Sequence, residues 1–545
     1  MKWLGILSVA VASGISAHAQ QYAPYPPYTN AMANAMSHTN TTAATAVTGT
    51  NFAAPDQIYA TLTNQLAAET NAPGATRELS LQDCIDMALQ HNINLQIFRY
   101  DPEIAQYALQ GAYAPYDPTG AFSGQHQHSQ SGPTFLGTNV IGGVLSDQDS
   151  FDTSLNGLLP FGTTYRFSGT TADTVQDQGV AGIKRNAGAQ ASVQVTQPLL
   201  KNLWIDSTRL VIQVDKNRLK YSELQLELEL MQTITQVEQA YYDLIYSREN
   251  VIVQQKAAEQ TDQLVVESKK KLEVGALAEL DLASAEAQAA QNRAAIIVAQ
   301  AQLGTQERLL KGLITDEFTK LADVDLIPAG SLTAPAMEFN RQQSWKTGLE
   351  KRPEYQQAKL DAERAGIQLK FDYNQLFPEV DVFGTYGYNG SGTVFSGALY
   401  DVQERNLPFY TFGGQISFPL ANIGARNTYK SDKVSLQQLV LQIKAVERNI
   451  LISIDNDIGN LKSAYDAVQA THAQRLYEVQ ALEAEKKKLE NGKSTTYNVL
   501  LVQRDLTSAR GAEIQALDVY NRDLSQLSLD EGTTLDRLNI VFEAK

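Results

Sequence analysis

The sequence has little cysteine and an excess of acid over base. Cys84 is the only cysteine in 545 residues, so no disulfide can form within the chain, even in an oxidising compartment. The chain has 44 Lys and Arg against 60 Asp and Glu, a net charge of −16. A nucleic-acid partner would call for a basic face, and this balance argues against one.

Motifs for catalysis and for metal binding are also missing. The sequence has no G-x-S-x-G, Walker loop, H-E-x-x-H or dinucleotide fingerprint, so we predict neither an enzyme nor a bound cofactor. His126 and His128 alternate on a predicted strand, but no carboxylate or cysteine cluster completes a metal site around them. A position on a water-exposed wall of the barrel explains these two histidines better than metal binding does.

Long apolar runs are confined to the first residues. Lys2, the apolar stretch WLGILSVAVASGIS and the small-residue site AHA before Gln20 predict a secretory signal peptide at 1–19. After it, no run of about 18 apolar residues predicts a transmembrane helix. Residues 20–77, rich in Ala, Thr, Asn, Pro and Tyr and almost uncharged, predict a disordered linker.

The chain contains the same helix end twice. KKKLEVG at 269–275 and KKKLENG at 486–492 each combine a lysine-rich last turn with the glycine of a helix C-terminus. Upstream, VTQPLL resembles ISFPLA, and DPTGAFSG resembles FPEVDVFG, at other offsets. The stepwise change of offset predicts two structural repeats, at 78–335 and 336–545, that differ by loop insertions. Each repeat has a short helix, strands, a very long helix, a tip and a second long helix.

Period-2 stretches of about ten residues predict the strands. The first repeat has them at about 118–130 and 188–197, and the second at about 379–390 and 409–419. A further alternating stretch at 151–170 permits an extra hairpin, so the chain has four or six strands. Their polar faces are rich in Gln, Thr, Ser and Gly, which favours a water-filled barrel over a soluble sandwich.

Apolar residues at 4-3-4-3 spacing predict the long helices. The predicted helices span about 206–272, 278–313, 342–376, 424–490 and 495–528. The spacing is that of a coiled-coil seam, and the two longest helices lack proline. At about 1.5 Å per residue, each of those two extends roughly 100 Å. Asp243, Asp455 and Asp457 lie within them, and we interpret these acids as facing a lumen or another subunit rather than as acid–base catalysts.

The predicted sheet is too small to close on itself. Lipid tolerates no unpaired sheet edge, and four or six strands are fewer than the usual minimum of about eight. Several copies must therefore share one transmembrane β-barrel, and the helices of the same ring form a hollow bundle. The predicted fold class is mainly α: a long coiled-coil α-barrel with a shared membrane β-barrel portion.

Three stretches together resemble the TolC family of outer-membrane efflux proteins. They are ELSLQDCIDMALQHNINLQ at 78–96, RPEYQQAKLDAERAGIQLKFDYNQLFPEVDVFGTYGY at 352–388 and KLENGKSTTYNVLLVQRDL at 488–506. One departure is Ile93, where the family usually has proline. The resemblance covers roughly residues 78–540.

The resemblance implies a homotrimer that works as a passive exit channel. It places the protein in the outer membrane of a diderm bacterium, in contact with outer-membrane lipid and extending into the periplasm. It implies two kinds of partner, a periplasmic adaptor and an inner-membrane RND or ABC transporter, in efflux or type I secretion. The alternative from the residues alone is a periplasmic or surface coiled-coil scaffold or adhesin with a soluble β-domain.

The resemblance also directs attention to the helix tips. Gly275 and Gly492 would mark the tip turns, where the adaptor docks. Family members have aspartates six and nine residues past the second tip glycine, which form acidic rings at the pore constriction. Here those positions are Asn498 and Leu501. An acidic ring from the second repeat is therefore absent.

The first repeat has acids near the same level. Asp281 lies six residues past the first tip glycine, and Glu279 lies close to it. In the family, a basic residue two past the second glycine pairs with this aspartate; here that position is Ser494, next to Lys493. Our hypothesis is that Asp281 and Glu279 keep acid at the constriction, with Lys493 as a candidate partner. The alternative is that both are ordinary first-turn acids stabilised by the helix dipole.

Overall fold

The computed structural model describes residues 76–136, 139–141, 143–177, 182–274 and 278–540. The predicted signal peptide lies outside these residues, as does the predicted linker except for its last two positions. Within the described part of the chain, no helix is both long and apolar enough to cross a membrane.

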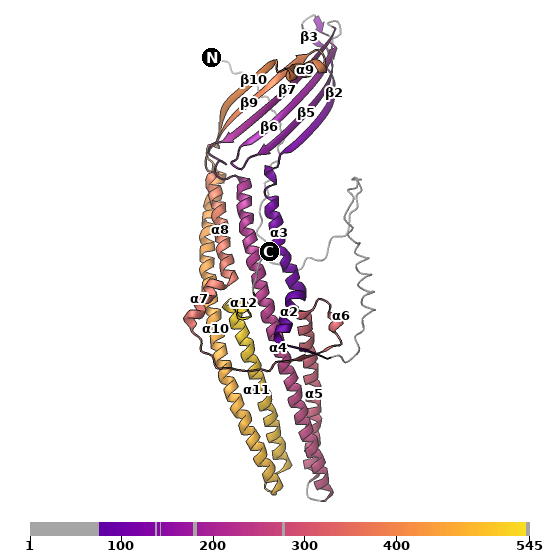
Figure 1. Ribbon diagram of the computed structural model, residues 1–545, viewed down its shortest axis with the longest axis vertical. Helices are drawn as coiled ribbons and strands as arrows, with labels where there is room; N and C mark the ends of the chain where they lie inside the picture. The colour runs from indigo at the N-terminus through magenta and orange to yellow at the C-terminus, as the bar shows by residue number, and fades with distance from the viewer. Residues whose placement is uncertain (1–75, 137–138, 142, 178–181, 275–277, 541–545) are drawn as a thin grey trace. The chain divides into compact units, whose positions relative to one another are not determined.

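Four long helices form two antiparallel pairs. α4 (Ser207–Glu273) packs against α5 (Glu279–Ile314), and α10 (Ile423–Glu490) packs against α11 (Thr496–Asp530). Figure 1 shows both pairs, and α11 also packs along α4. These bounds lie within two residues of the ranges that the sequence predicts. Side-chain caps fix two of the helix starts, because Asp206 accepts from the backbone N–H of Arg209 and Thr495 accepts from that of Asn498.

The predicted seams form the helical core. In α4 the seam residues are all buried: Leu230, Ile234, Val237, Tyr241 and Leu244. In α10 the seam residues between positions 450 and 468 are buried in a second cluster: Ile450, Ile454, Ile458, Leu461 and Val468. Burying each large apolar side chain contributes about 1.5–3 kcal/mol, so the seams are the main source of helix-pair stability.

A kinked pair of short helices opens each repeat. In the first repeat, α2 (Leu81–His91) and α3 (Ile93–Gly111) meet at Asn92, which has an extended backbone with φ −65° and ψ 118°. In the second, α7 (Arg341–Lys351) and α8 (Pro353–Asn374) meet at Arg352 with φ −64° and ψ 122°. The single helix predicted at 342–376 is therefore wrong. Pro353 disfavours a helical Arg352 and takes the first position of a new helix.

Short elements complete the two repeats. A capping box between Ser80 and Asp83 starts α2, where Cys84 is fully buried and its burial raises the thiol pKa to about 12. The minor elements are η1 (Ala114–Tyr116), α6 (Phe318–Leu321), α12 (Thr534–Arg537) and the parallel pair β1 (Thr76–Leu79) and β8 (Asp325–Pro328).

The principal sheet has six antiparallel strands. In chain order they are β2 (Thr119–Gln130), β5 (Leu145–Leu158), β6 (Thr164–Asp177), β7 (Ile183–Pro198), β9 (Glu379–Gly392) and β10 (Leu407–Ser417). Their order in space is β10-β9-β7-β6-β5-β2, as Figure 1 shows. Of the two strand counts that the sequence left open, the structure has six, and the extra hairpin is longer than 151–170. β3 (Thr134–Leu136) and β4 (Asn139–Ile141) form a separate hairpin.

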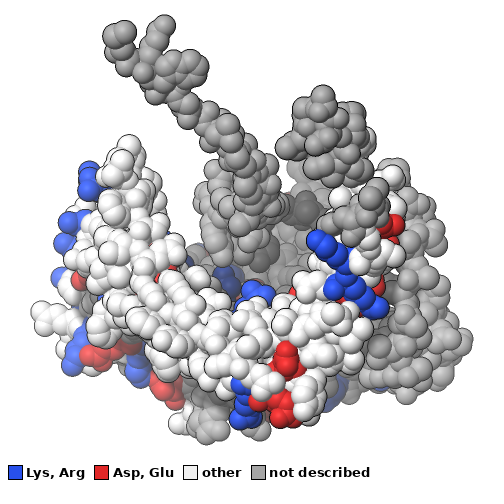
Figure 2. Space-filling model, turned by 90° about the horizontal axis from the view of Figure 1, so that it is seen from above, with Lys and Arg blue, Asp and Glu red and all other residues white. Residues whose placement is uncertain are grey.

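The sheet has one apolar face and one polar face. Cross-strand register places Phe122, Thr153, Gly169, Ala191 and Tyr388 in one row of the apolar face. The next row of the same face contains Leu155, Phe167, Val193, Tyr386 and Tyr410. The alternating positions, such as Ser154, Ser168 and Ser192, form the polar face. Viewed from above, the described surface is mostly uncharged, with Lys, Arg, Asp and Glu in a few separate groups (Figure 2).

Candidate functional site at the helix tips and strand–helix junctions

The second tip is a tight helix end that requires glycine. Gly492 has φ +69°. Its backbone N–H donates to the Leu489 carbonyl at 3.1 Å, and the N–H of Lys493 donates to the Lys488 carbonyl at 2.8 Å. These two bonds define a Schellman motif, which satisfies carbonyls at the end of α10 and reverses the chain within a few residues.

A hydroxyl closes the same tip. The Ser494 hydroxyl donates to the carboxylate of Glu485, which also accepts from Lys488 Nζ at 2.9 Å. The Asn498 amide donates to Ser494 Oγ at 3.4 Å. The Ser494 hydroxyl, followed by Lys488, holds the pKa of Glu485 below its ordinary value. Ser494 stands where the resemblance leads us to expect a basic residue, two positions past Gly492. Its hydroxyl instead links Asn498 of α11 to Glu485 of α10.

The predicted constriction residues of the second repeat differ in exposure. Asn498 and Lys493 are exposed, while Leu501 is half-buried. Between them, Val499 and Leu500 are buried in a cluster that packs both tips together. The other buried members of that cluster are Leu264, Ala285, Leu482 and Leu506.

The first tip lies partly outside the described residues, which exclude Gly275. Glu279 and Asp281 occupy the first turn of α5, where Glu279 is exposed and Asp281 is half-buried. Lys269 and Glu286 form an ion pair at 3.0 Å between α4 and α5. No ion pair joins Asp281 to Lys493 within the described part of this single chain, and their pairing stays a prediction.

Replacing Gly492 with alanine should loosen the second tip. A Cβ at Gly492 would meet no atom within 4 Å, so the cost comes from the left-handed backbone alone. We expect a local destabilisation of about 1 kcal/mol, seen as faster amide hydrogen exchange at residues 489–498. Gly459→Ala is the control: it lies inside α10 with open space around it, and there alanine should stabilise the helix. Equal effects of the two variants would contradict this account.

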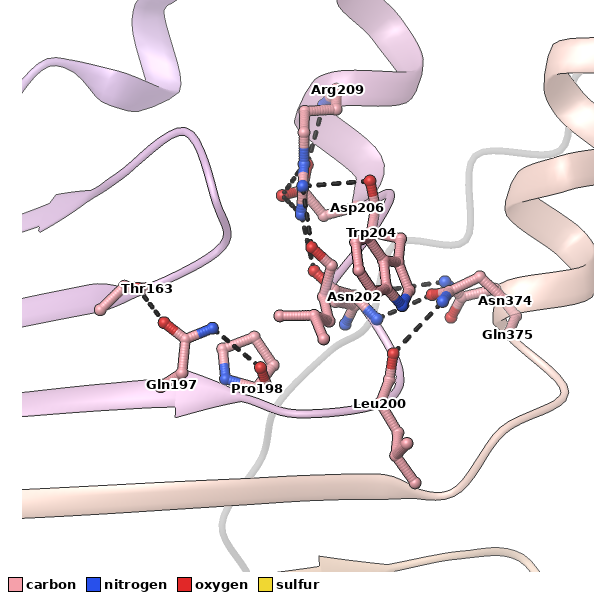
Figure 3. A network of polar contacts seen from close by, with 11 residues as sticks. Thr163, Gln197, Pro198, Leu200, Asn202, Trp204, Asp206, Arg209, Asn374 and Gln375 are labelled. Carbon is pink, nitrogen blue, oxygen red and sulfur yellow. Dashed lines mark hydrogen bonds and ion pairs between the residues drawn. The ribbon is translucent and has the colours of Figure 1, made fainter.

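The joint between β7 and α4 is a network that the sequence did not reveal. Asn202 has a left-handed backbone with φ +65°. Arg209 donates to the carbonyls of Asn202, Leu203 and Trp204 at 2.7, 2.9 and 3.1 Å, and its Nε donates to Asp206 at 2.9 Å. Figure 3 shows this network around the turn. One guanidinium therefore satisfies three carbonyls and fixes the direction in which α4 leaves the sheet.

The end of α8 supports the same joint from the second repeat. Asn374 Oδ1 accepts from the Asn202 N–H at 2.7 Å, and Gln375 donates to Asn202 Oδ1 at 3.1 Å (Figure 3). The equivalent turn after β10 uses Asn422, which has φ +43° and donates to the Leu376 carbonyl at 3.2 Å. Both asparagines follow the matched VTQPLL and ISFPLA motifs, which was the available sequence signal.

Comparisons with known proteins agree on the fold. Residues 346–530 match the family model described as "Outer membrane efflux protein". The outer-membrane channel OprN has a TM-score of 0.63 at 13% identity, over 83% of this chain and 90% of that one. The CmeC outer membrane channel of Campylobacter jejuni has a TM-score of 0.60 at 15% identity, over 84% and 88%. No curated protein matches the sequence.

A third solved structure, the outer membrane protein VceC of Vibrio cholerae, has a TM-score of 0.61 at 17% identity, over 83% of this chain and 96% of that one. These likenesses confirm the fold, and over residues 346–530 the family match confirms the resemblance drawn from the sequence. Residues 346–530 therefore match the outer membrane efflux protein family, and the chain as a whole has the fold of the TolC-like outer-membrane channels.

Proposed function

We propose that this protein is the homotrimeric exit duct of a tripartite efflux or type I secretion system. It conducts passively, and an inner-membrane RND or ABC transporter supplies the energy through a periplasmic adaptor. The observation that carries the proposal is the open six-stranded sheet, which has opposite faces of opposite polarity and two edges without a partner strand among the described residues.

The two edges are complementary. β2 and β10 are the outer strands, and β2 is exposed along its whole length. Since neighbouring strands alternate in direction through six strands, β10 of one copy would run antiparallel to β2 of the next. Three copies of this sheet would close a barrel of eighteen strands, with the apolar face toward lipid and the polar face toward water.

The tips provide a surface for an adaptor. Val274 and Leu280 are each 78% exposed at the first tip, and Tyr497 is 59% exposed at the second. Exposed apolar side chains at a helix end are typical of a surface that a partner covers. In the sequence, Gly275 follows Val274 directly and Gly492 lies five residues before Tyr497, which is in keeping with adaptor docking at the two turns.

Reconstitution tests the proposal. The purified protein should behave in detergent as an assembly of three chains, each of 59.8 kDa before any processing, and should conduct ions across a planar bilayer. The coiled-coil scaffold or adhesin makes the opposite prediction: a species that stays soluble without detergent and conducts no current. Efflux with candidate pumps can then separate the RND from the ABC alternative.

Single-channel recording also tests the constriction hypothesis. We expect Asp281→Ala to lower the preference for cations over anions, by about two-fold or more, because an acid at a narrow point attracts cations. Ser284→Ala is the matched control on the same helix, since the Ser284 hydroxyl only donates to the Leu280 carbonyl, at 2.9 Å. Strong cation selectivity that Asp281→Ala leaves unchanged would refute the hypothesis.

A further inference from the structure

A short helix for which the sequence gives no periodic signal lies on the principal sheet. α9 (Phe395–Gln403) follows β9 and packs against β9, β7 and β6. Figure 1 shows it at the end of the sheet that lies far from the long helices. Ala398 is 1% exposed and lies against Ala187 and Ala189 of β7. A Cβ at Gly390 would stand only 1.9 Å from the Ala398 carbonyl oxygen. The small residues therefore let the helix lie directly on the strands.

The register shows that α9 occupies the apolar face. Ala187 pairs with Gly392, and Ala189 pairs with Gly390. Because side chains alternate along a strand, these positions share a face with Ala191 and Tyr388. The rings of Phe395 and Phe151 pack edge to face with their centroids 6.1 Å apart, which adds a contact with β5 on that face. The helix therefore lies outside the channel that we propose, on the side that faces lipid.

The apolar face becomes charged just at the level of α9. Asp149 pairs across the strands with Asp173, which pairs with Ala187 beneath the helix. In these last rows, His126 contacts Asp149 at 2.7 Å and Arg185 Nε donates to Asp173 at 3.1 Å. On the other side of α9, the rows are aromatic and aliphatic. The helix thus marks the boundary between the apolar and the charged parts of one face.

The outward side of α9 is partly apolar. Leu399 is 41% exposed and Tyr400 is 59% exposed. At the end of the helix, Asp401 accepts from the Ser391 N–H at 3.4 Å and from the Asn406 amide at 3.3 Å, which fixes the polar end to the loop. An aliphatic side chain and a tyrosine at one level are typical of the interface between hydrocarbon and headgroups.

We propose that α9 is an interfacial membrane helix, with Leu399 and Tyr400 in contact with lipid at the outer-leaflet boundary. Lipid is the occupant because the exposed side of α9 is continuous with the apolar face, which the proposed outer-membrane barrel turns toward lipid. The inference rests on the proposed function, in that the apolar face must be the outside of the barrel. It adds a position for the membrane boundary on this chain.

Site-directed spin labelling of the full chain in lipid vesicles tests this. Cys84 is fully buried, so the native thiol stays unlabelled and a new cysteine can be labelled alone. Leu399→Cys is compared with two controls on β2: Phe122→Cys on the apolar face and Gln127→Cys on the polar face. The measurement is accessibility to oxygen, which concentrates in lipid, relative to a water-soluble nickel chelate.

We expect the oxygen-to-nickel ratio at position 399 to be several-fold higher than at 127 and lower than at 122. A label at 399 as accessible to nickel as the label at 127, with 122 still in lipid, would overturn the inference alone. A label at 399 shielded from both reagents would overturn it in favour of a protein covering the helix. If the label at 122 were also in water, the proposed membrane sheet itself would fail.

Discussion

Replacing Arg537 with alanine should lower the free energy of unfolding by about 3–5 kcal/mol. Arg537 lies in α12, and its Nη2 contacts both carboxylate oxygens of Glu238 at 2.5 Å. The Glu238 side chain is 0% exposed within α4, so it has lost its hydration entirely. Without the guanidinium, a buried carboxylate would be left without its counter-charge, and that desolvation cost is what the variant reveals.

A second ion pair to α12 provides a matched control. Lys351 contacts Asp536 of α12, but these side chains are 46% and 63% exposed, so Lys351→Ala should cost under about 1 kcal/mol. Thermal melting of detergent-solubilised protein, followed by circular dichroism, compares the two variants. The double variant Glu238→Leu with Arg537→Leu should recover much of the loss, because it removes both charges at once. Equal losses for Arg537→Ala and Lys351→Ala would show that burial of Glu238 is not the cause.

Raising the pH should destabilise the helical part of the protein, because Asp457, which lies next to Asp530, then loses a proton that stabilises the folded state. Burial, and then the neighbouring Asp530, raise the pKa of Asp457 to about 8. Asp523 adds to the rise, while Arg352, which contacts Asp530 at 3.3 Å, opposes it. In the folded state Asp457 therefore holds a proton that bridges α10 and α11, whereas in the unfolded chain it loses that proton near its ordinary pKa of about 4.

The direction of this pH effect follows from the coupling between folding and proton binding. Below about pH 4 both states hold the proton, and the stabilising contribution is complete. Between about pH 4 and 8 only the folded state holds it, so stability falls as pH rises, by at most about 1.4 kcal/mol per unit. Asp457 is only half-buried, so solvent screening reduces the total to about 1–3 kcal/mol. Above about pH 8 the contribution is lost and the slope ends.

Asp457→Asn tests this linkage, because asparagine donates a hydrogen bond at every pH. We expect the melting temperature of this variant to fall less than that of the parent between pH 5 and 9. Asp455→Asn, two residues away and 3.7 Å from Arg341, is the control and should retain the full slope. Burial also raises the pKa of Asp518 and of Asp372 to about 7, so part of the slope remains in every variant. Identical slopes for parent and Asp457→Asn would contradict the shared proton.

The sequence predicted the elements with local periodicity. The seam of α4 and the alternation of β9 are encoded in neighbouring residues, and their bounds followed from it. The break at Arg352 was readable from Pro353, but the apolar pattern runs through it and suggested one helix. α9 has nine residues, which is too short for periodicity to distinguish it from a loop.

Contacts between distant residues were beyond the sequence. Glu238 and Arg537 are 299 positions apart, and no local pattern links them. The sequence suggests that Asp457 and Asp243 face a lumen or another subunit, whereas the structure pairs them inside the chain with Asp530 and Arg522. At the tips, spacing from Gly492 located Ser494, but its bond to Glu485 depends on how the turn brings the two helices together.

The difference between the two edges of the sheet has a genetic consequence. Since β2 and β10 are unlike strands, copies joined in the proposed ring would be linked head to tail, and each copy is needed by both neighbours. A subunit in which β10 cannot pair would still have an intact β2. It would therefore join assembling rings through β2 and prevent them from closing. An allele with this defect, expressed beside the normal gene, should therefore act as a dominant one.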